Sequence, residues 1–158
     1  MRDVSDPAAV VRGILDVNFY LVIGSADGSG RPWANPVYFT MHDHREVQWV
    51  SRPSARHSKN IAERPDVSLV VFDSQAVPGD GQAVYMEAQA AEMTASPDFE
   101  RTLERFNYAR YADPTLHGLT VFDAASVRSP AELRLYRAIV SHHYILESES
   151  DRRMPVEL

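Results

Sequence analysis

The stretch that decides the fold is NFYLVIGSADGSGRPWANPVYFTMHDHREVQWVS, residues 18–51. Residues 18–26 and 33–41 are rich in β-branched and aromatic side chains, which favour strands, and the Asp-Gly-Ser-Gly-Arg-Pro segment between them is typical of a turn. A short polar turn at 42–46 precedes another apolar strand at 47–51. The stretch therefore predicts three consecutive antiparallel strands in a meander.

Helical patterns flank these strands. One covers residues 6–16. A second begins at Ser54, a candidate N-cap, and stops at Pro65, with Ile61 and Ala62 expected on its buried side.

A third helix is expected from Ser96, a candidate cap followed by Pro97, to about Arg110. Three apolar residues recur along it at helical spacing, and this face is most simply part of the core: Phe99, Leu103 and Phe106.

Further strands are expected at 67–72, at 82–94 and once or twice between 128 and 148. Six or seven mostly antiparallel strands with helices between them predict a mainly β protein of the α+β class, folded as a small barrel. Residues 146–158 are charged, and we expect a loose tail there that could dock Met154, Pro155 and Val156 on a partner chain.

Composition narrows the function classes. A chain of 158 residues that is 44% hydrophobic predicts one domain over 1–158. Without cysteine, it cannot use a thiolate nucleophile or a cysteine-ligated metal. No apolar segment approaches the length of a membrane span and the N-terminus does not resemble a secretory signal, so we expect a cytoplasmic protein that binds no membrane. The net charge of -6 argues against nucleic acid as a partner.

Within this acidic chain, residues 51–59 carry three cations and no acid: Arg52, Arg56 and Lys59. A strand that runs into a helix start presents free backbone N–H groups to an anion. Ser51, Ser54 and Ser58 add hydroxyl donors, and the Arg56 guanidinium can hold a phosphate with two parallel hydrogen bonds. The alternative is purely structural, with Ser54 as a cap and the cations as the solvated face of a helix. Composition alone leaves both interpretations open.

The order of elements in residues 30–72 resembles the pyridoxamine phosphate oxidase-like family of FMN-binding split barrels. The features that carry the resemblance are a turn ending in Gly-Arg-Pro, a hairpin to an aromatic strand ending in Ser, a basic helix start, and a helix stop before an apolar strand. The resemblance covers about 19–93 well and the rest of the chain only loosely. It implies a split barrel, an FMN cofactor, and a homodimer with the cofactors in grooves between the chains.

The resemblance also implies site residues. The strand beside the flavin ring falls on Asn35, Pro36, Val37 and Tyr38. The strand end near the ribityl chain and phosphate falls on Val50 and Ser51, and the ring-proximal glutamine of the next strand on Gln82.

The family's phosphate-binding Arg-Lys pair falls on Arg56 and His57. Histidine in place of lysine is a departure, because a histidine can be neutral at pH 7. Lys59 or Arg52 would then supply the second positive charge, with Ser54 as a further donor.

The substrate-binding residues of the true oxidase are not recognisable, and Tyr136 and His143 are the nearest candidates. The resemblance therefore implies an FMN-dependent oxidoreductase acting on a small redox substrate other than pyridoxamine phosphate, with no catalytic side chain identified. The alternatives are a deazaflavin-dependent reductase on the same fold and a non-catalytic flavin carrier or sensor. The histidines at 42, 44, 142 and 143 lack a third ligand at a defined spacing, so we expect no metal site.

Overall fold

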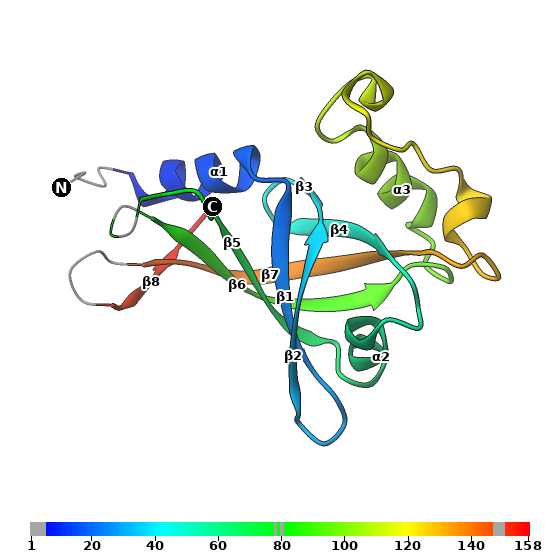
Figure 1. Ribbon diagram of the computed structural model, residues 1–158, viewed down its shortest axis with the longest axis horizontal. Helices are drawn as coiled ribbons and strands as arrows, with labels where there is room; N and C mark the ends of the chain where they lie inside the picture. The colour runs from blue at the N-terminus through cyan, green and yellow to red at the C-terminus, as the bar shows by residue number, and fades with distance from the viewer. Residues whose placement is uncertain (1–5, 78, 80, 147–150) are drawn as a thin grey trace.

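The computed structural model of the protein describes residues 6–77, 79, 81–146 and 151–158 (Figure 1). Its helices are α1 (Pro7–Val17), α2 (Arg56–Glu63) and α3 (Phe99–Tyr108), with short 3-10 helices η1 (Pro114–His117) and η2 (Ala124–Val127). Its strands are β1 (Tyr20–Ala26), β2 (Pro32–Tyr38), β3 (Thr40–His42), β4 (Glu46–Ser51), β5 (Asp66–Phe72), β6 (Ala83–Glu92), β7 (Arg134–Leu146) and β8 (Arg153–Val156).

The strands form one antiparallel sheet in the order β2-β1-β5-β6-β7-β4-β3, with β8 paired to β7. The sheet curls into a half-barrel, which confirms the predicted mainly β split barrel with helices (Figure 1). The strands number eight rather than six or seven. The extra ones come from a division within 33–41 and from the C-terminal segment.

The predicted meander is wrong at Phe39. The chain breaks there into β2, which pairs with β1, and β3, which pairs with β4 at the other end of the sheet. The Phe39 side chain is fully buried, and its backbone N–H donates to the Phe19 carbonyl. Because the chain bends at this buried residue, the two hairpins border the sheet on opposite sides instead of lying next to each other.

The main core fills the curled sheet. Its largest fully buried side chains include Trp49, Leu69 and Met86, and the apolar face of α1 covers one side through Val11 and Leu15. A smaller core lies under α3, where the predicted apolar face is buried. The two cores lie on opposite faces of β4 and β7, since Trp49 and Tyr136 belong to the first and Val50 and Leu135 to the second.

Two predicted helix caps are wrong. Ala55, not Ser54, is the N-cap residue of α2, and it makes no side-chain cap. Asp98, not Ser96, precedes α3, and the Ser96 hydroxyl accepts instead from the Asp98 backbone N–H. In both places the turn before the helix is longer than the sequence pattern indicated.

The buried face of α2 is more polar than predicted. Ala62 is exposed, whereas His57, Ser58 and Asn60 are buried beside Ile61. The helix packs against β1, where the Asn60 amide donates to the Ser25 hydroxyl over 3.0 Å. The buried residues of α2 are polar because polar groups such as the Ser25 hydroxyl line this end of the half-barrel.

The prediction of a loose C-terminal tail is wrong for residues 153–156. They form β8 against the last residues of β7, and Val156 joins the main core of this same chain. Strand β7 has 13 residues and pairs with β4 through only its first six, so its remaining edge is open to β8. In the described residues, the helices are all too short or too polar to cross a membrane.

Candidate functional site

The start of α2, where β4 ends, brings together several predicted phosphate-binding residues. The His57 imidazole lies 2.9 Å from the Ser51 hydroxyl, through Nε2. Burial lowers the pKa of His57 below its usual value, so the imidazole is neutral near pH 7. His57 and Ser58 face the interior of the half-barrel, and they anchor α2 instead of offering a positive charge.

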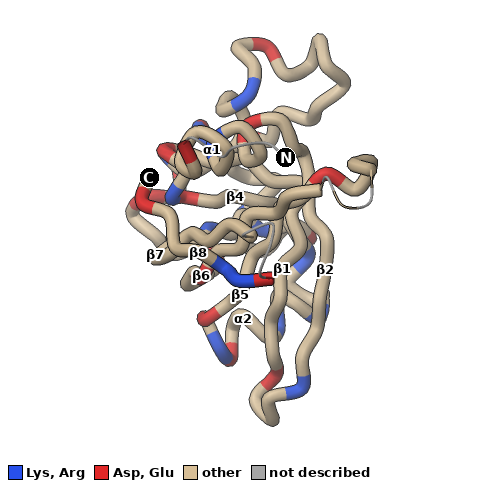
Figure 2. The backbone as a smooth tube through the Cα atoms, turned by 90° about the vertical axis from the view of Figure 1, so that its left-hand side faces the viewer, with Lys and Arg blue, Asp and Glu red and all other residues tan. Residues whose placement is uncertain are grey.

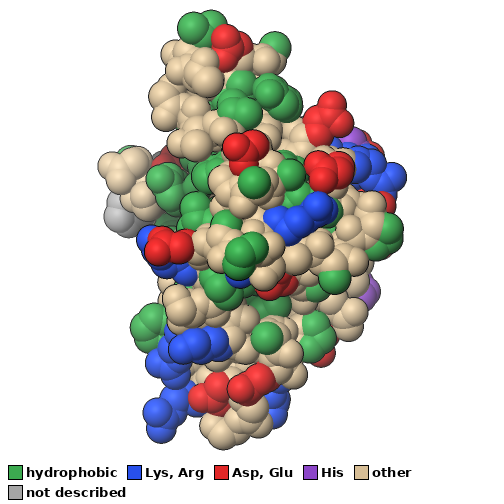
Figure 3. Space-filling view, turned by 90° about the vertical axis from the view of Figure 1, so that its right-hand side faces the viewer, with side chains coloured by type: hydrophobic (Ala, Val, Ile, Leu, Met, Phe, Trp, Pro, Cys, Tyr) green, Lys and Arg blue, Asp and Glu red, His purple; other side chains and the backbone are tan. Residues whose placement is uncertain are grey.

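The cations at this helix start differ in their surroundings. Arg56 and Lys59 are exposed, and neither makes an ion pair with any residue that the structure describes. Arg52, by contrast, pairs with Glu132 at 2.6 Å. Two of the three predicted cations are therefore free to meet an anion, and Arg and Lys side chains gather over this lower part of the molecule (Figure 3).

Arg56 is supported by an aromatic ring. Its guanidinium carbon lies 4.5 Å from the centroid of the Trp33 ring, and Trp33 is 39% exposed. Trp33 was not among the site residues predicted from the sequence. The sequence signal that could have found Trp33 is its position two residues before Asn35, on the strand at the sheet edge. Its contact with α2 could not be predicted from the sequence.

The predicted ring-binding strand is β2. It is the last strand at one end of the sheet, so one of its backbone edges has no strand partner among the described residues. Asn35 is half-buried and Pro36 exposed, whereas the Val37 side chain points into the main core. A ligand on this strand would meet its backbone edge and the side chains of Asn35 and Pro36, not that of Val37.

Tyr38 and Val50 come together on the α3 side of the sheet, where both pack against the smaller core. The Tyr38 ring meets Phe106 edge-on, with centroids 5.9 Å apart. Burial raises the pKa of the Tyr38 hydroxyl and the nearby Arg110 opposes that rise, so the hydroxyl stays protonated.

Gln82 is not brought to the other predicted residues. It precedes β6, beside the end of β5, whereas α2 leads into the start of β5 (Figure 1). The seven residues of β5 separate the two places by about 20 Å at the usual rise of about 3.3 Å per residue. Within one chain, Gln82 cannot share a site with Arg56.

A groove of about 700 Å³ lies along β1, β2 and the start of β5. Its lining is mostly small, with Gly24, Ala26, Ala34 and Ser68, and Trp33 borders it as well. A Cβ on Gly24 would come within 2.2 Å of the Ser68 hydroxyl oxygen, so a larger residue there would require the Ser68 side chain to rotate away. The volume lies in the range of small-molecule sites, which are about 300–1,000 Å³.

Flavin chemistry fits this part of the molecule in two respects. A phosphate needs cations that no acid neutralises, and Arg56 and Lys59 meet that requirement. A planar ring needs a flat, accessible surface, and the partnerless edge of β2 with its neighbouring groove provides one.

The two remaining predicted candidates differ in position. Tyr136 stacks on Trp49 inside the main core, with ring centroids 5.6 Å apart. Its hydroxyl lies close to the Ser58 side chain in the first turn of α2. His143 is buried, and its Nε2 donates to the His44 carbonyl over 2.7 Å, far from the start of α2. In the parts of the chain that the structure describes, no three His, Asp or Glu side chains converge as a metal site would require.

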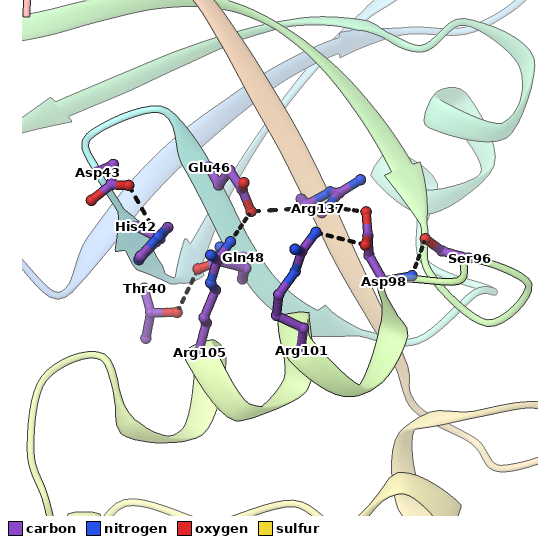
Figure 4. Close-up of polar contacts among 10 residues, drawn as sticks. All are labelled: Thr40, His42, Asp43, Glu46, Gln48, Ser96, Asp98, Arg101, Arg105 and Arg137. Carbon is purple, nitrogen blue, oxygen red and sulfur yellow. Dashed lines mark hydrogen bonds and ion pairs between the residues drawn. The ribbon is translucent and has the colours of Figure 1, made fainter.

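A second group of arginines lies between α3 and the sheet (Figure 4). Glu46 accepts from Arg105 at 2.9 Å and lies 3.9 Å from Arg137. Asp98 accepts from Arg101 at 2.6 Å and from Arg137 at 3.3 Å. Each of these guanidiniums has a carboxylate partner, so the group fixes α3 to β4 and β7 and offers no free cation.

A sequence profile of pyridoxamine 5'-phosphate oxidase matches residues 9–131, more than half of the chain. The chain belongs to the pyridoxamine 5'-phosphate oxidase family. The match covers every strand from β1 to β6, all of α2 and α3, and α1 from its third residue. A search of curated proteins found no match.

Solved structures with the same fold include proteins that bind different cofactors. The heme storage protein HutZ from Vibrio cholerae is 15% identical, with a TM-score of 0.59 over 85% of this chain and 89% of its own. A heme-binding protein from Mycobacterium smegmatis is 14% identical, with a TM-score of 0.68 over 96% of this chain and 58% of its own. An FAD-binding protein from Mesorhizobium loti is 14% identical, with a TM-score of 0.65 over 89% of this chain and 94% of its own. These similarities establish the fold.

Proposed function

We propose that this protein is an FMN-dependent oxidoreductase whose substrate is a small redox-active molecule other than pyridoxamine phosphate. The observation that carries the proposal is the pair of exposed cations, Arg56 and Lys59, left without acidic partners at the start of α2 in an otherwise acidic chain. In this proposal they bind the flavin phosphate together with the free backbone N–H groups of the first helical turn. Ser54 is exposed beside them as a further donor.

The other predicted site residues position the helix start and the flavin ring. Ser51 and His57 hold the start of α2 against the end of β4 through their 2.9 Å contact. Asn35, Pro36 and the backbone of Val37 and Tyr38 form the surface for the flavin ring, with Val50 supporting Tyr38 from the smaller core. The bound flavin supplies the electron or hydride chemistry, while the chain binds it, orients it and limits access of water.

The site is incomplete in one chain, and we propose a homodimer. Gln82 lies at the far end of β5 from the cations, so it would serve the cofactor held by the partner copy. Large apolar side chains are exposed near both places, with Trp33 at 39% beside Arg56 and Phe72 at 46% beside Gln82, and a symmetric contact would bury them on both copies. Analytical ultracentrifugation tests this: a monomer at all concentrations would contradict the shared site.

Two alternatives remain on the same fold. A deazaflavin with an acidic tail needs cations beyond the phosphate site, and Glu132 already neutralises one candidate, Arg52. The ion pair therefore favours FMN. The second alternative is a non-catalytic carrier or sensor. It is motivated by the buried His57 in place of the family's lysine and by the lack of recognisable substrate-binding arginines. Two of the structural relatives bind or store heme, so heme belongs among the cofactors to test.

The test is a titration of purified, cofactor-free protein with FMN, the deazaflavin and heme in separate experiments, followed by flavin fluorescence or heme absorbance. Tight, saturable binding of FMN supports the proposal, and reduction of bound FMN by a nicotinamide donor separates an enzyme from a carrier. Preference for the deazaflavin or for heme would overturn the cofactor assignment. Binding of none would overturn the function as a whole.

A further inference from the structure

A separate cavity lies between the last residues of α1, strand β3 and the residues that follow α3. Helices α1 and α2 lie on opposite sides of the half-barrel (Figures 1 and 2). Its volume is about 490 Å³, within the usual range of about 300–1,000 Å³ for small-molecule sites. Its apolar walls come from Val17, Phe19, Met41 and Tyr111. Val17 is 71% exposed and Phe19 40%, so the apolar surface is open to a ligand.

The cavity contains one cation, Arg110, and backbone carbonyls accept from three of its five N–H donors. One terminal nitrogen donates to the Asp16 carbonyl over 3.1 Å, and the other donates to the carbonyls of Asn18 and Phe39. The remaining guanidinium nitrogen, Nε, is buried. Arg110 therefore compensates the negative end of α1, which has no basic residue in its last turn, and most of its donors are directed at the backbone and not at a ligand.

The cavity also contains one anion, Asp16, and this one is accessible. Its side chain is 65% exposed. One carboxylate oxygen lies 2.9 Å from His44 Nε2, and the other makes no hydrogen bond to a described residue. A carboxylate only accepts hydrogen bonds, so a ligand must bring a donor to this point.

Two aromatic rings border the same space. The face of Phe19 carries the Arg110 guanidinium, 4.7 Å from its centroid. Tyr111 stacks on His117 with centroids 3.7 Å apart, which holds its ring in place. Rings fixed in this way offer both apolar surface and π-faces to a planar ligand.

From these four observations we infer a second small-molecule site, which binds an aromatic amine. The planar ring of the ligand packs between Phe19 and Tyr111, and its ammonium group donates to the free oxygen of Asp16. The site is independent of the flavin site, because it shares no residue with α2 or β2. An aromatic acid is disfavoured, since its carboxylate would face the like charge of Asp16.

The test compares two probes with the same ring and opposite charge, tryptamine and indole-3-propionate, by isothermal titration calorimetry of the purified full chain. We expect saturable binding of tryptamine and at least tenfold weaker binding of indole-3-propionate. No saturable binding of tryptamine, or equal affinity for the two probes, would overturn the inference.

Variants then locate the site. Asp16→Asn keeps the side-chain shape and should abolish the preference for the amine, with the fold checked by circular dichroism. Asp43→Asn is the matched control, because Asp43 is also exposed and also contacts one histidine, His42, at 3.1 Å. Unchanged preference in Asp16→Asn, or the same loss in Asp43→Asn, would contradict the site.

A second variant tests the site without changing Asp16, so the test does not depend on whether Asp16→Asn folds. Val17→Arg places a cation at the mouth of the cavity at an exposed position, and it should weaken tryptamine at least tenfold. Arg56→Ala should leave tryptamine binding unchanged, so failure of the flavin proposal and failure of this inference give different results.

Discussion

Two arginine-rich regions of this half-barrel behave in opposite ways. Between α3 and the sheet, two carboxylates, Glu46 and Asp98, are shared among three guanidiniums at distances from 2.6 to 3.9 Å. At the start of α2, Arg56 and Lys59 are exposed and no described carboxylate faces them. The first region uses its cations to hold the fold together, and the second leaves them available to an anion.

A run of cations in the sequence is therefore not by itself an anion-binding site. Whether the cations can bind an anion depends on whether other elements of the fold place carboxylates beside them. Arg52 illustrates this within the second region, because its partner Glu132 is 80 residues away in the chain. Each prediction below changes one side of this contrast.

The largest expected effect follows removal of a free cation. Arg56→Ala should weaken FMN binding by about 10- to 150-fold, because a hydrogen bond to a charged group contributes about 1.5–3 kcal/mol. Fluorescence titration measures it. Arg101→Ala is the matched control, since Arg101 is an exposed helical arginine paired with Asp98. Equal losses in the two variants would show that the contrast between free and paired arginines has no functional meaning.

A smaller effect is expected from the ring that supports Arg56. Trp33→Leu should weaken FMN binding about 2- to 30-fold, the range given by about 0.5–2 kcal/mol for a cation–π contact. Trp33→Phe should retain much of the affinity. If Trp33 acts through Arg56, Trp33→Leu should have little further effect in the Arg56→Ala background. Additive losses would mean that Trp33 touches the ligand directly.

In the region between α3 and the sheet, Glu46→Gln should lower the free energy of unfolding by about 1 kcal/mol, because it leaves Arg105 without its partly buried partner. Urea unfolding measures the loss, and high salt should reduce it. FMN affinity should stay the same, since the group lies between α3 and the sheet and not at α2. A loss of FMN affinity comparable to that of Arg56→Ala would show that the region between α3 and the sheet also contributes to FMN binding, which contradicts the contrast.

The last prediction concerns the binding of protons by two buried histidines. Burial lowers the pKa values of His57 and His143, so below the ordinary histidine pKa of 6.5 the unfolded chain binds more protons than the folded one. Stability should be complete above that pH and fall as the pH drops through it, by at most about 1.4 kcal/mol per pH unit for each histidine. His57→Gln should flatten this slope in urea unfolding between pH 7 and 5. An unchanged slope would show that His57 is protonated in the fold.

Much of the fold could be predicted from the sequence because the information is local. Alternating apolar residues marked the strands, and the spacing of Phe99, Leu103 and Phe106 marked the buried face of α3. The division at Phe39 could not be predicted, since it depends on which distant strands β2 and β3 pair with. Strand β8 was hidden because its stability comes from the open edge of β7 and not from its own charged sequence.

The candidate site could be predicted in part. The sequence located the cations and the strand beside them, but it could not distinguish the inward-facing His57 from the outward-facing Arg56, which adjoin in the chain. Nor could it bring Trp33 to Arg56 or separate Gln82 from both. These features depend on the side of α2 that packs on β1 and on the curl of the sheet.

The central claim is that Arg56 and Lys59 bind the phosphate of a flavin. The most direct measurement compares FMN with riboflavin, which has the same ring and ribityl chain but no phosphate, by titration of the cofactor-free protein. The account predicts that FMN binds at least about tenfold more tightly, as hydrogen bonds from two cations to a phosphate require. Equal affinity for FMN and riboflavin would contradict it, because the free cations at α2 would then have no role in holding the ligand.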